Sequence, residues 1–266
     1  MDNRRRMLLS GGLSADPVLE NNDWETISKL ASNGEAANIW SIGDIKSVKL
    51  NGKVGALTFN NQTYNCFILG FSHNEAREGK GIHFSFGKTL GSKDIAFCDS
   101  YYNKTEVVYD CFNMNYMVTN ENGWEGSTIR KYIIPAFLNS LPIDLKSKIT
   151  ACNKFTDNVG NAYSQLSSVT STEDYIFLLS EFEVAGIRSK ANQYEQNYQK
   201  QYDYYKFGNS KIRYKHNAEG NAAYWWLRSP AYNASSHFCY VELNGSVAIT
   251  TSSYSLGFVP CFKVGA

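Results

Sequence analysis

Two adjacent tryptophans, an arginine and a proline stand directly before a segment with no hydrophobic period, and this contrast constrains the fold most. The stretch 223–257 reads AYWWLRSPAYNASSHFCYVELNGSVAITTSSYSLG. A tryptophan ring buries on the order of 200 Å², and a buried arginine offers several donors to nearby loop carbonyls. Ser229-Pro230 predicts a rigid turn. We therefore expect a fixed core element followed by short strands and turns with polar side chains.

The totals indicate a folded globular protein with little overall charge. Of the 266 residues, 43% are hydrophobic and 19% are charged, which suits one large domain or two small ones. The net charge of +1 favours neither nucleic acid nor an acidic membrane as a partner. No apolar run approaches the roughly 18 residues that span a bilayer. The 18 tyrosines predict either a binding surface or a tyrosine-rich β core.

The cysteines and the N-terminus carry weaker information. The six cysteines are far apart and form no CxxC pair, so we interpret them as buried free thiols, with a few disulfides as the alternative. Residues 1–37 predict an N-terminal arm or joining segment with a short helix at 24–31, and Arg4-Arg5-Arg6 would make the arm basic. A cleaved signal peptide is the alternative for the first residues.

The remaining pattern predicts an α+β domain over residues 38–266. Alternating residues from 39 to 98 predict strands, with a hairpin at Asn51-Gly52. Residues 128–141 have helical spacing that Pro135 should interrupt, and a second helix follows from Pro142. Residues 189–222 are rich in Tyr, Gln and Lys and predict a partly helical surface insertion. Short strands follow within 223–264, with a hairpin at Asn244-Gly245.

No pattern in the chain predicts catalysis. His73 and His83 flank a loop that also holds Glu75 and Glu78, so a metal site is conceivable, but their spacing matches no ligand motif and favours ordinary strand or loop histidines. The carboxylate pairs Asp94/Asp99 and Glu181/Glu183 are typical of solvated faces or turn caps. We therefore predict no catalytic residue, no metal and no cofactor.

Several stretches together resemble a bacterial and phage family, the variable proteins of diversity-generating retroelements. The resemblance rests on YWWLRSP, FCYVELNGS and GFVPCF near the C-terminus, and on IWSIGDIKSVKLNGKVG, FILGFSHN, IAFCDSYYN, GWEGSTIR and IFLLSEFEVAG before them. It covers most of the chain from Ile39 onward. It implies a C-type lectin-like fold related to formylglycine-generating enzymes, with a variable region at about 224–264.

In that family an error-prone reverse transcriptase alters template adenines, so that asparagine codons become many residues on a fixed backbone. The resemblance therefore implies a non-enzymatic protein that recognises varied protein or cell-surface targets, on a phage virion or a bacterial surface. The motifs of calcium-dependent sugar binding, E-P-N or Q-P-D with W-N-D, do not occur in this sequence, so calcium-dependent sugar binding is not implied.

The resemblance divides the C-terminal residues into a structural frame and a displayed set. The frame would comprise Trp225, Trp226, Arg228, Pro230, Gly245 and Gly257, continued by Phe238, Cys239, Val241 and Pro260. The displayed, ligand-binding set would comprise Ala231, Tyr232, Asn233, Ser235, Ser236, His237, Tyr240, Glu242, Leu243, Ser246, Ala248, Ile249, Thr250, Thr251, Tyr254 and Leu256. Glu242 departs from the pattern because adenine changes alone do not convert those asparagine codons to glutamate. It either has a different template codon or belongs to the frame.

Three alternatives stay open at this point. In the first alternative, the C-terminal segment is an ordinary run of strands with polar outer faces. In the second, the protein is a non-diversified phage tail or fibre protein attached through its basic arm. In the third, it is an oxidase of the formylglycine-generating type, which would bind copper through a cysteine pair; Cys239 and Cys261 offer no clear match to that pair.

Overall fold

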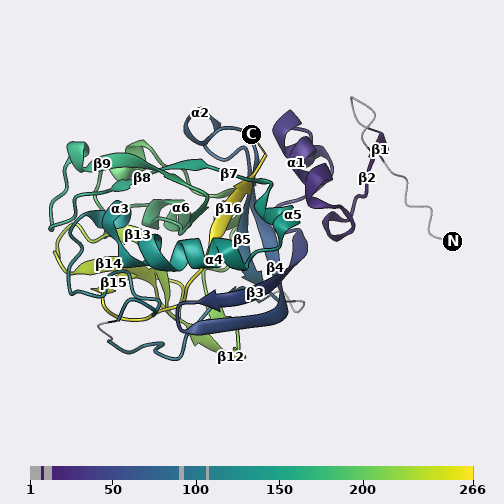
Figure 1. Ribbon diagram of the computed structural model, residues 1–266. Coiled ribbons are helices and arrows are strands. Elements are labelled where there is room, and N and C mark those ends of the chain that lie inside the picture. The colour runs from purple at the N-terminus through teal and green to yellow at the C-terminus, as the bar shows by residue number, and fades with distance from the viewer. Residues whose placement is uncertain (1–6, 9–13, 90–92, 106–107, 266) are drawn as a thin grey trace.

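A curled antiparallel sheet forms the centre of the fold, which a computed structural model describes for residues 7–8, 14–89, 93–105 and 108–265 (Figure 1). Its strands lie in the spatial order β10 (Ile176–Phe177), β16 (Cys261–Val264), β5 (Ile82–Lys88), β4 (Leu57–Phe71) and β3 (Ile45–Val54), and β7 (Ile149–Thr150) also pairs with β16. Because β16 lies between β10 and β5, the last strand of the chain closes this sheet.

Smaller sheets hold the other strands. They comprise β13 (Trp225–Pro230), β14 (His237–Val241) and β15 (Val247–Thr251) in that order; β12 (Ala218–Ala223), β11 (Arg213–Lys215) and β6 (Ile95–Ala96); β8 (Cys152–Asp157) with β9 (Val169–Asp174); and β1 (Met7–Leu8) with β2 (Ser14–Ala15). Only the β11–β6 pair among these is parallel. The fold class is therefore α+β with mostly antiparallel strands, as predicted.

The helices are short and pack around the sheets. They are α1 (Trp24–Asn33), α2 (Glu75–Glu78), α3 (Gly123–Gly126), α4 (Ile134–Ser140), α5 (Ile143–Lys146), α6 (Glu181–Ala185) and α7 (Asp203–Lys206), with 3₁₀ turns at Leu19–Asn21, Ala36–Asn38, Leu166–Ser168 and Glu195–Asn197. Within the described ranges, no helix has both the length and the apolar character needed to cross a membrane.

The N-terminal segment belongs to the core from Ala15 onward, so the prediction of an arm over residues 1–37 is wrong from that residue on. Asp23 caps α1 by accepting a hydrogen bond from the Thr26 N–H at 2.7 Å. Trp24 is buried, and its ring centroid lies 5.5 Å from that of Phe84 in β5. The predicted basic residues Arg4, Arg5 and Arg6 lie outside the described residues.

The two predicted Asn-Gly hairpins have different outcomes. Asn244-Gly245 does form the turn between β14 and β15: Gly245 has φ +85° and its N–H donates to the Glu242 carbonyl at 2.9 Å. The hairpin at Asn51-Gly52 is wrong, because β3 continues through both residues with a register shift between Leu50 and Gly52. The chain turns instead at Gly55, where φ is +57° and a Cβ would lie 2.4 Å from the Asp110 carbonyl oxygen.

Pro135 interrupts the predicted helix of residues 128–141 as expected. A π-helical turn spans Ile129–Ile133, and α4 begins directly afterwards with Pro135 in its first turn. A first-turn proline loses no intrahelical hydrogen bond, because the N–H groups at that position have no partner within the helix. The change of helix type therefore places the proline where the helix tolerates it.

Residues 189–222 are partly helical, as predicted, and many of them are exposed, but the segment is not only a surface insertion because several of its polar side chains are buried. The buried Glu195 carboxylate accepts hydrogen bonds from the Ser229 hydroxyl at 2.6 Å and from the Asp157 N–H at 3.0 Å. Burial raises the pKa of Glu195 to about 7. Tyr202 and Arg213 are also buried. Polar residues misled the prediction because their partners lie elsewhere in the chain.

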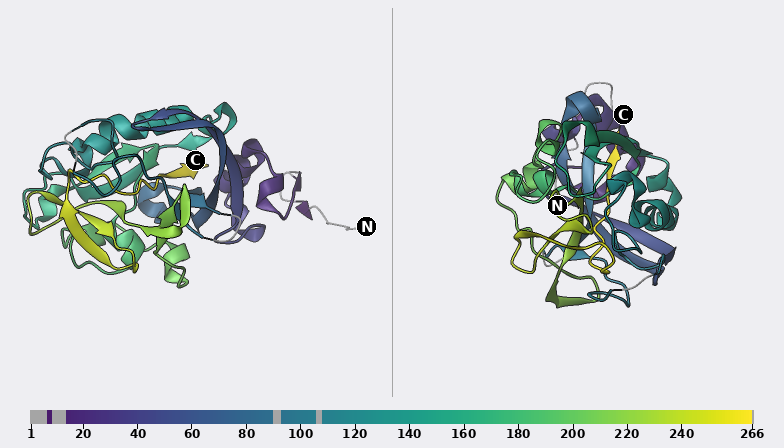
Figure 2. Two further views of the ribbon diagram at one scale, coloured as in Figure 1. Left: turned by 90° about the horizontal axis from the view of Figure 1, so that it is seen from below. Right: turned by 90° about the vertical axis from the view of Figure 1, so that its left-hand side faces the viewer.

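The β13–β15 sheet lies at one end of the molecule, and α1 lies at the other (Figures 1 and 2). The strand β13 is buried at all six positions, and β14 is buried at Phe238, Cys239 and Val241. The turn predicted at Ser229-Pro230 is wrong, because β13 extends through both residues and the chain turns at 232–233. Every side chain of β15 is half-buried. Side-chain burial at this end therefore decreases from β13, which is fully buried, to β15, which is an edge strand in contact with solvent.

We predict that Gly257→Ala destabilises the protein by about 1–3 kcal/mol, because an added methyl group would overpack the join between two sheets. A Cβ at Gly257 would lie 2.7 Å from the Ala96 Cβ and 2.8 Å from the Tyr224 carbonyl oxygen. Urea denaturation measures the loss. Gly220→Ala is the matched control, since nothing lies within 4 Å of its added Cβ. Equal stability of both variants would contradict the packing argument.

Candidate functional site

The strand β13 is anchored by side chains that hydrogen-bond to distant backbone. The indole N–H of Trp225 donates to the Lys211 carbonyl at 3.0 Å, and that of Trp226 donates to the Phe112 carbonyl at 2.9 Å. Both rings are fully buried. The polar edge of each ring is thus satisfied while its apolar face contributes to the core. Pro230 and Gly257 are also buried, and Gly245 is half-buried in the β14–β15 turn.

Arg228 joins β13 to α6 and β8 through its guanidinium group. It donates to both carboxylate oxygens of Glu183, to the Leu178 carbonyl at 2.7 Å and to the Thr156 hydroxyl at 2.7 Å. Glu183 also forms a capping box with Ser180 at the start of α6. The sequence analysis expected the pairs Glu181/Glu183 and Asp94/Asp99 on solvated faces or as turn caps. All four residues are buried, so the solvated face is wrong, whereas Glu183 does cap a helix.

Lys154 extends this buried network to the first half of the chain. Its ammonium group lies 2.6 Å from Glu78, 3.0 Å from Glu183 and 2.9 Å from the Tyr202 hydroxyl. Burial by itself raises the pKa of Glu183, but Arg228 and Lys154 outweigh it and hold that pKa well below its usual range. Two carboxylates and two cations therefore balance one another inside the protein.

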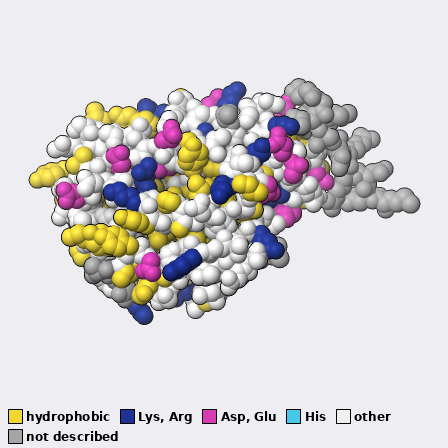
Figure 3. Space-filling model, in the orientation of Figure 1, with side chains coloured by type: hydrophobic (Ala, Val, Ile, Leu, Met, Phe, Trp, Pro, Cys, Tyr) yellow, Lys and Arg dark blue, Asp and Glu magenta, His cyan; other side chains and the backbone are white. Residues whose placement is uncertain are grey.

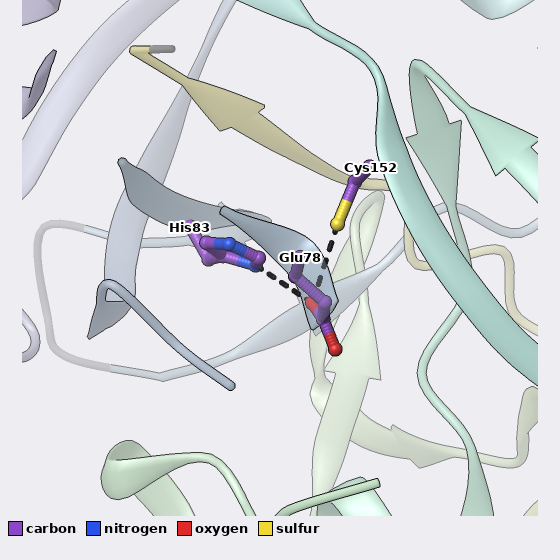
Figure 4. A group of neighbouring side chains, drawn as sticks. All are labelled: Glu78, His83 and Cys152. Carbon is purple, nitrogen blue, oxygen red and sulfur yellow. Dashed lines mark hydrogen bonds and ion pairs between the residues drawn. The ribbon is translucent and has the colours of Figure 1, made fainter. Parts of the chain in front are cut away.

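Two groups of possible metal ligands share Glu78 within this network. Glu78, His83 and Cys152 form one group (Figure 4), and His73, Glu78 and Glu183 form the other, with ligand atoms within 4.8 Å of one another in each. Lys154 is already bound to Glu78, so a cation occupies the position that a metal ion would take. Burial also raises the pKa of the Cys152 thiol, which disfavours the thiolate that metals bind. This geometry favours an internal ion-pair network over a metal centre.

His73 and His83 come together because β4 pairs with β5. Gly70 pairs with His83, and the chain places His73 three residues later, with ring centroids 5.6 Å apart. His73 also stacks on Tyr202 with centroids 3.7 Å apart. Loop spacing alone gave no reason to expect this contact; strand register could have suggested it.

The displayed set is only partly exposed. Ala231 and Leu256 are 1% and 2% exposed, so including them in a ligand-binding surface was wrong. Both pack inward because they adjoin the ends of the buried sheet. The exposed members are Asn233, Ser235, Leu243 and Ser246, and the half-buried members are Tyr232, Ser236, His237, Tyr240, Glu242, Ala248, Ile249, Thr250, Thr251 and Tyr254.

The set occupies both ends of one hairpin and its middle. The β13–β14 connection holds Asn233 and Ser235, and the β14–β15 turn at the other end holds Leu243 and Ser246. The middle links them, since Tyr240 pairs with Ala248 and neighbouring paired side chains share a face of the sheet. A single ligand that contacts both ends of the hairpin must therefore also cover its middle.

Two tyrosines outside the predicted set complete a continuous face, which we name the tyrosine surface. It comprises Tyr102, Tyr224 and Tyr240, with Lys215, Glu242 and Ala248 beside them. The rings of Tyr224 and Tyr240 lie 5.6 Å apart, and the Tyr224 N–H donates to the Tyr102 hydroxyl at 2.8 Å. Lys215 lies 4.2 Å above the Tyr102 ring. All six residues are half-buried. On the face drawn in Figure 3, hydrophobic side chains of several segments are interspersed with polar ones.

Residues 90–265 match the family described as Domain of unknown function (DUF6273). The chain belongs to this family. No curated protein and no solved structure matches it. The matched region contains β13 to β16, Lys154, Glu183 and Arg228, but its boundary leaves out β3 to β5 and Glu78. The central sheet and the buried network therefore continue across the family boundary.

We predict that Arg228→Met destabilises the protein by about 3–5 kcal/mol, because Glu183 loses its two-point partner inside the core. Urea denaturation measures this loss. Lys29→Met removes an exposed ion pair with Glu25 and should leave the denaturation midpoint unchanged. Similar midpoints for both variants would show that the network does not hold the fold together.

His73 gives a second prediction, on pH. Burial, with a contribution from Lys154, lowers the pKa of His73 to about 3. The unfolded chain therefore binds a proton at His73 below about pH 6.5 that the folded protein does not, and stability is lost as the pH falls. We expect acidification from pH 7 to 5 to destabilise the parent by about 2 kcal/mol more than His73→Gln. Equal losses in both proteins would contradict a buried, neutral His73.

Proposed function

We propose that the protein is a non-enzymatic ligand-binding protein whose C-terminal surface recognises varied protein or cell-surface targets. We further propose that a retroelement diversifies this surface on a C-type lectin-like scaffold, and that the protein acts on a phage virion or a bacterial surface. The main support is the tyrosine surface, which lies directly against a fully buried strand.

A buried strand beneath a solvated hairpin suits a surface whose residues change. Arg228 and the two tryptophans fix β13 through contacts that point away from solvent. Ala248 and Thr250 lie on the same face of β15 and are half-buried. Substitutions at exposed positions typically change stability by no more than about 0.5 kcal/mol, and Asn233 and Ser235 on this hairpin are exposed. Variation there would alter the ligand without unfolding the scaffold.

The chemistry of the tyrosine surface also favours recognition. Tyrosine offers a large rigid contact area and a hydroxyl, with little entropy lost on binding. Lys215 and Glu242 place one charge of each sign beside the rings, which allows polar pairing at the rim of an interface. The β12–β13–β14 region thus combines aromatic anchors with polar neighbours.

The two cysteines considered for an oxidase give that alternative no support. Cys239 and Cys261 are fully buried as free thiols. Burial raises the pKa of both, that of Cys261 to about 11. A protonated, buried thiol is a poor metal ligand and a poor nucleophile. The binding proposal therefore remains the better supported.

A displayed library tests the proposal. Randomising Asn233, Ser235, Ala248 and Thr250 should leave most clones folded and should yield binders against a panel of purified proteins. Tyr240→Ala should then lower the affinity of selected binders by about tenfold or more, since aromatic anchors dominate such interfaces. Surface display and titration of each clone provide the measurement.

A control library randomises Phe238, Cys239 and Val241, which are buried on the same hairpin. Most of its clones should fail to fold. Equal survival of both libraries, or binders whose affinity does not change with Tyr240→Ala, would refute the proposed surface.

Diversification has its own test. Sister genes should differ mainly at the exposed and half-buried positions between 232 and 254, and a reverse transcriptase gene and a template repeat should lie beside them. Even variation along the gene would refute that part alone.

A further inference from the structure

The loop that joins β13 to β14 is held in place by Asn120, which lies outside the C-terminal region. The Asn120 side-chain amide is within hydrogen-bond distance of the carbonyls of Ala231, Ala234 and His237, at 3.3, 2.9 and 3.0 Å. Its backbone N–H donates to the Ser235 carbonyl at 2.7 Å, and Asn120 is fully buried. Every acceptor is a backbone carbonyl, so these contacts do not depend on which side chains the loop carries. A loop ordered in advance also loses less entropy when it binds.

Two further segments of the chain adjoin the same loop. The Asn161 N–H donates to the side-chain oxygen of Asn120 at 2.9 Å, which brings the segment after β8 beside the loop. On another side, the Tyr232 N–H donates to the Lys190 carbonyl at 2.9 Å, and the Arg188 guanidinium lies 4.3 Å from the centre of the Tyr232 ring. The loop is therefore surrounded by three segments that precede the C-terminal region.

Each of these segments presents large apolar side chains to solvent, and we name the five side chains the collar. The collar comprises Met117, Val118, Val159, Tyr163 and Ile187, which are 55%, 60%, 47%, 63% and 67% exposed. The Met117 carbonyl accepts a hydrogen bond from the Ser252 hydroxyl at 2.9 Å, and the Ser252 N–H donates to the Ser236 carbonyl of the loop at 2.8 Å. Single exposed apolar residues are ordinary, whereas several around one loop mark a contact surface.

The backbone before Tyr163 is strained. Gly160, Asn161 and Ala162 have φ of +71°, +64° and +60°, and an alanine seldom adopts such a value. The packing is tight at this point, because a Cβ on Gly160 would lie 2.0 Å from the Asn120 carbonyl oxygen. Strain of this kind persists only where the surroundings impose it, and it is concentrated at binding sites. Here it directs the chain around Asn120 while Tyr163 remains in solvent.

The loop alone is too small to hold a protein partner. A stable protein–protein interface takes about 800 Å² and about 20–30 residues from each partner. The loop contributes only Tyr232, Asn233, Ser235 and Ser236 as displayed residues, and most of these are small and polar. The collar adds apolar area directly around them. Exposed apolar side chains around a polar loop suit the broad surface of a folded protein better than a small molecule, which binds in a concave pocket.

We propose, resting on the proposed function, that the target is a folded protein that packs on the collar while the β13–β14 loop decides which protein is bound. The collar lies outside the C-terminal region, so it offers the same apolar contacts to every target. The loop changes its side chains on a backbone that Asn120 fixes. Shared contacts and variable contacts therefore come from different parts of the chain.

Binders with different loop sequences, selected from the displayed library against purified proteins, test the proposal. Tyr163→Ser combined with Ile187→Ser should lower the affinity of most of these binders by about tenfold or more, whatever the loop sequence. Tyr175→Ser combined with Ile143→Ser is the matched control and should leave affinity unchanged. These two side chains are 49% and 75% exposed, at the β9–β10 junction and in α5. Because all four side chains are at the surface, both variants should fold.

The outcomes separate the collar from the proposed function. Unchanged affinity in the collar variant, or an equal loss in the control variant, would overturn the collar and leave the proposed function standing. A library without binders would overturn both. Light scattering tests the other occupant, a second copy of this chain. We expect the parent to be a monomer, and a dimer that the collar variant dissociates would contradict the proposal.

Discussion

The two-point contact between Arg228 and Glu183 is the interaction on which most of the structure depends. Each ion would be unstable alone in the interior, since moving a charge out of water costs several kcal/mol. Together with Lys154 and Glu78 they form a neutral set in which each charge has a hydrogen-bonded partner. The set connects β13, α6, β8 and α2, so these elements must assemble together. Such networks specify one arrangement more than they add stability.

That constraint explains how a hairpin with few inward-facing apolar groups keeps a defined shape. The tryptophans and Arg228 fix the position of β13, and β14 adds Phe238, Cys239 and Val241 to the core. β15 pairs with β14 through its backbone, and Val247 and Ile249 pack against the core. The outer strand is therefore free to carry Ala248 and Thr250 as half-buried side chains. A binding surface that tolerates change follows from this division between buried and edge strands.

The same network also holds His73. Tyr202 holds the imidazole by stacking and contacts Lys154 through its hydroxyl. The family match begins at residue 90, whereas His73, Glu78 and His83 precede it. Because β16 pairs with β5 across that boundary, the matched region does not close its central sheet alone.

Local sequence patterns determined the elements whose signals are short-range. The α+β class, the helix at Trp24, the interruption at Pro135 and the Asn244-Gly245 turn all follow from periodicity, capping and turn chemistry. Burial of Trp225, Trp226 and Arg228 was expected from their size and donors. Tertiary structure alone decided that Glu183 and Lys154 are buried, that β3 continues through Gly52, and that Glu195 and Arg213 are buried within the segment 189–222. It also brought Tyr102 and Tyr224 beside Tyr240, and His73 onto Tyr202. The reason is physical: a charge or a polar ring is stable inside only with its partner, and that partner lies tens of residues away, where no local pattern shows it.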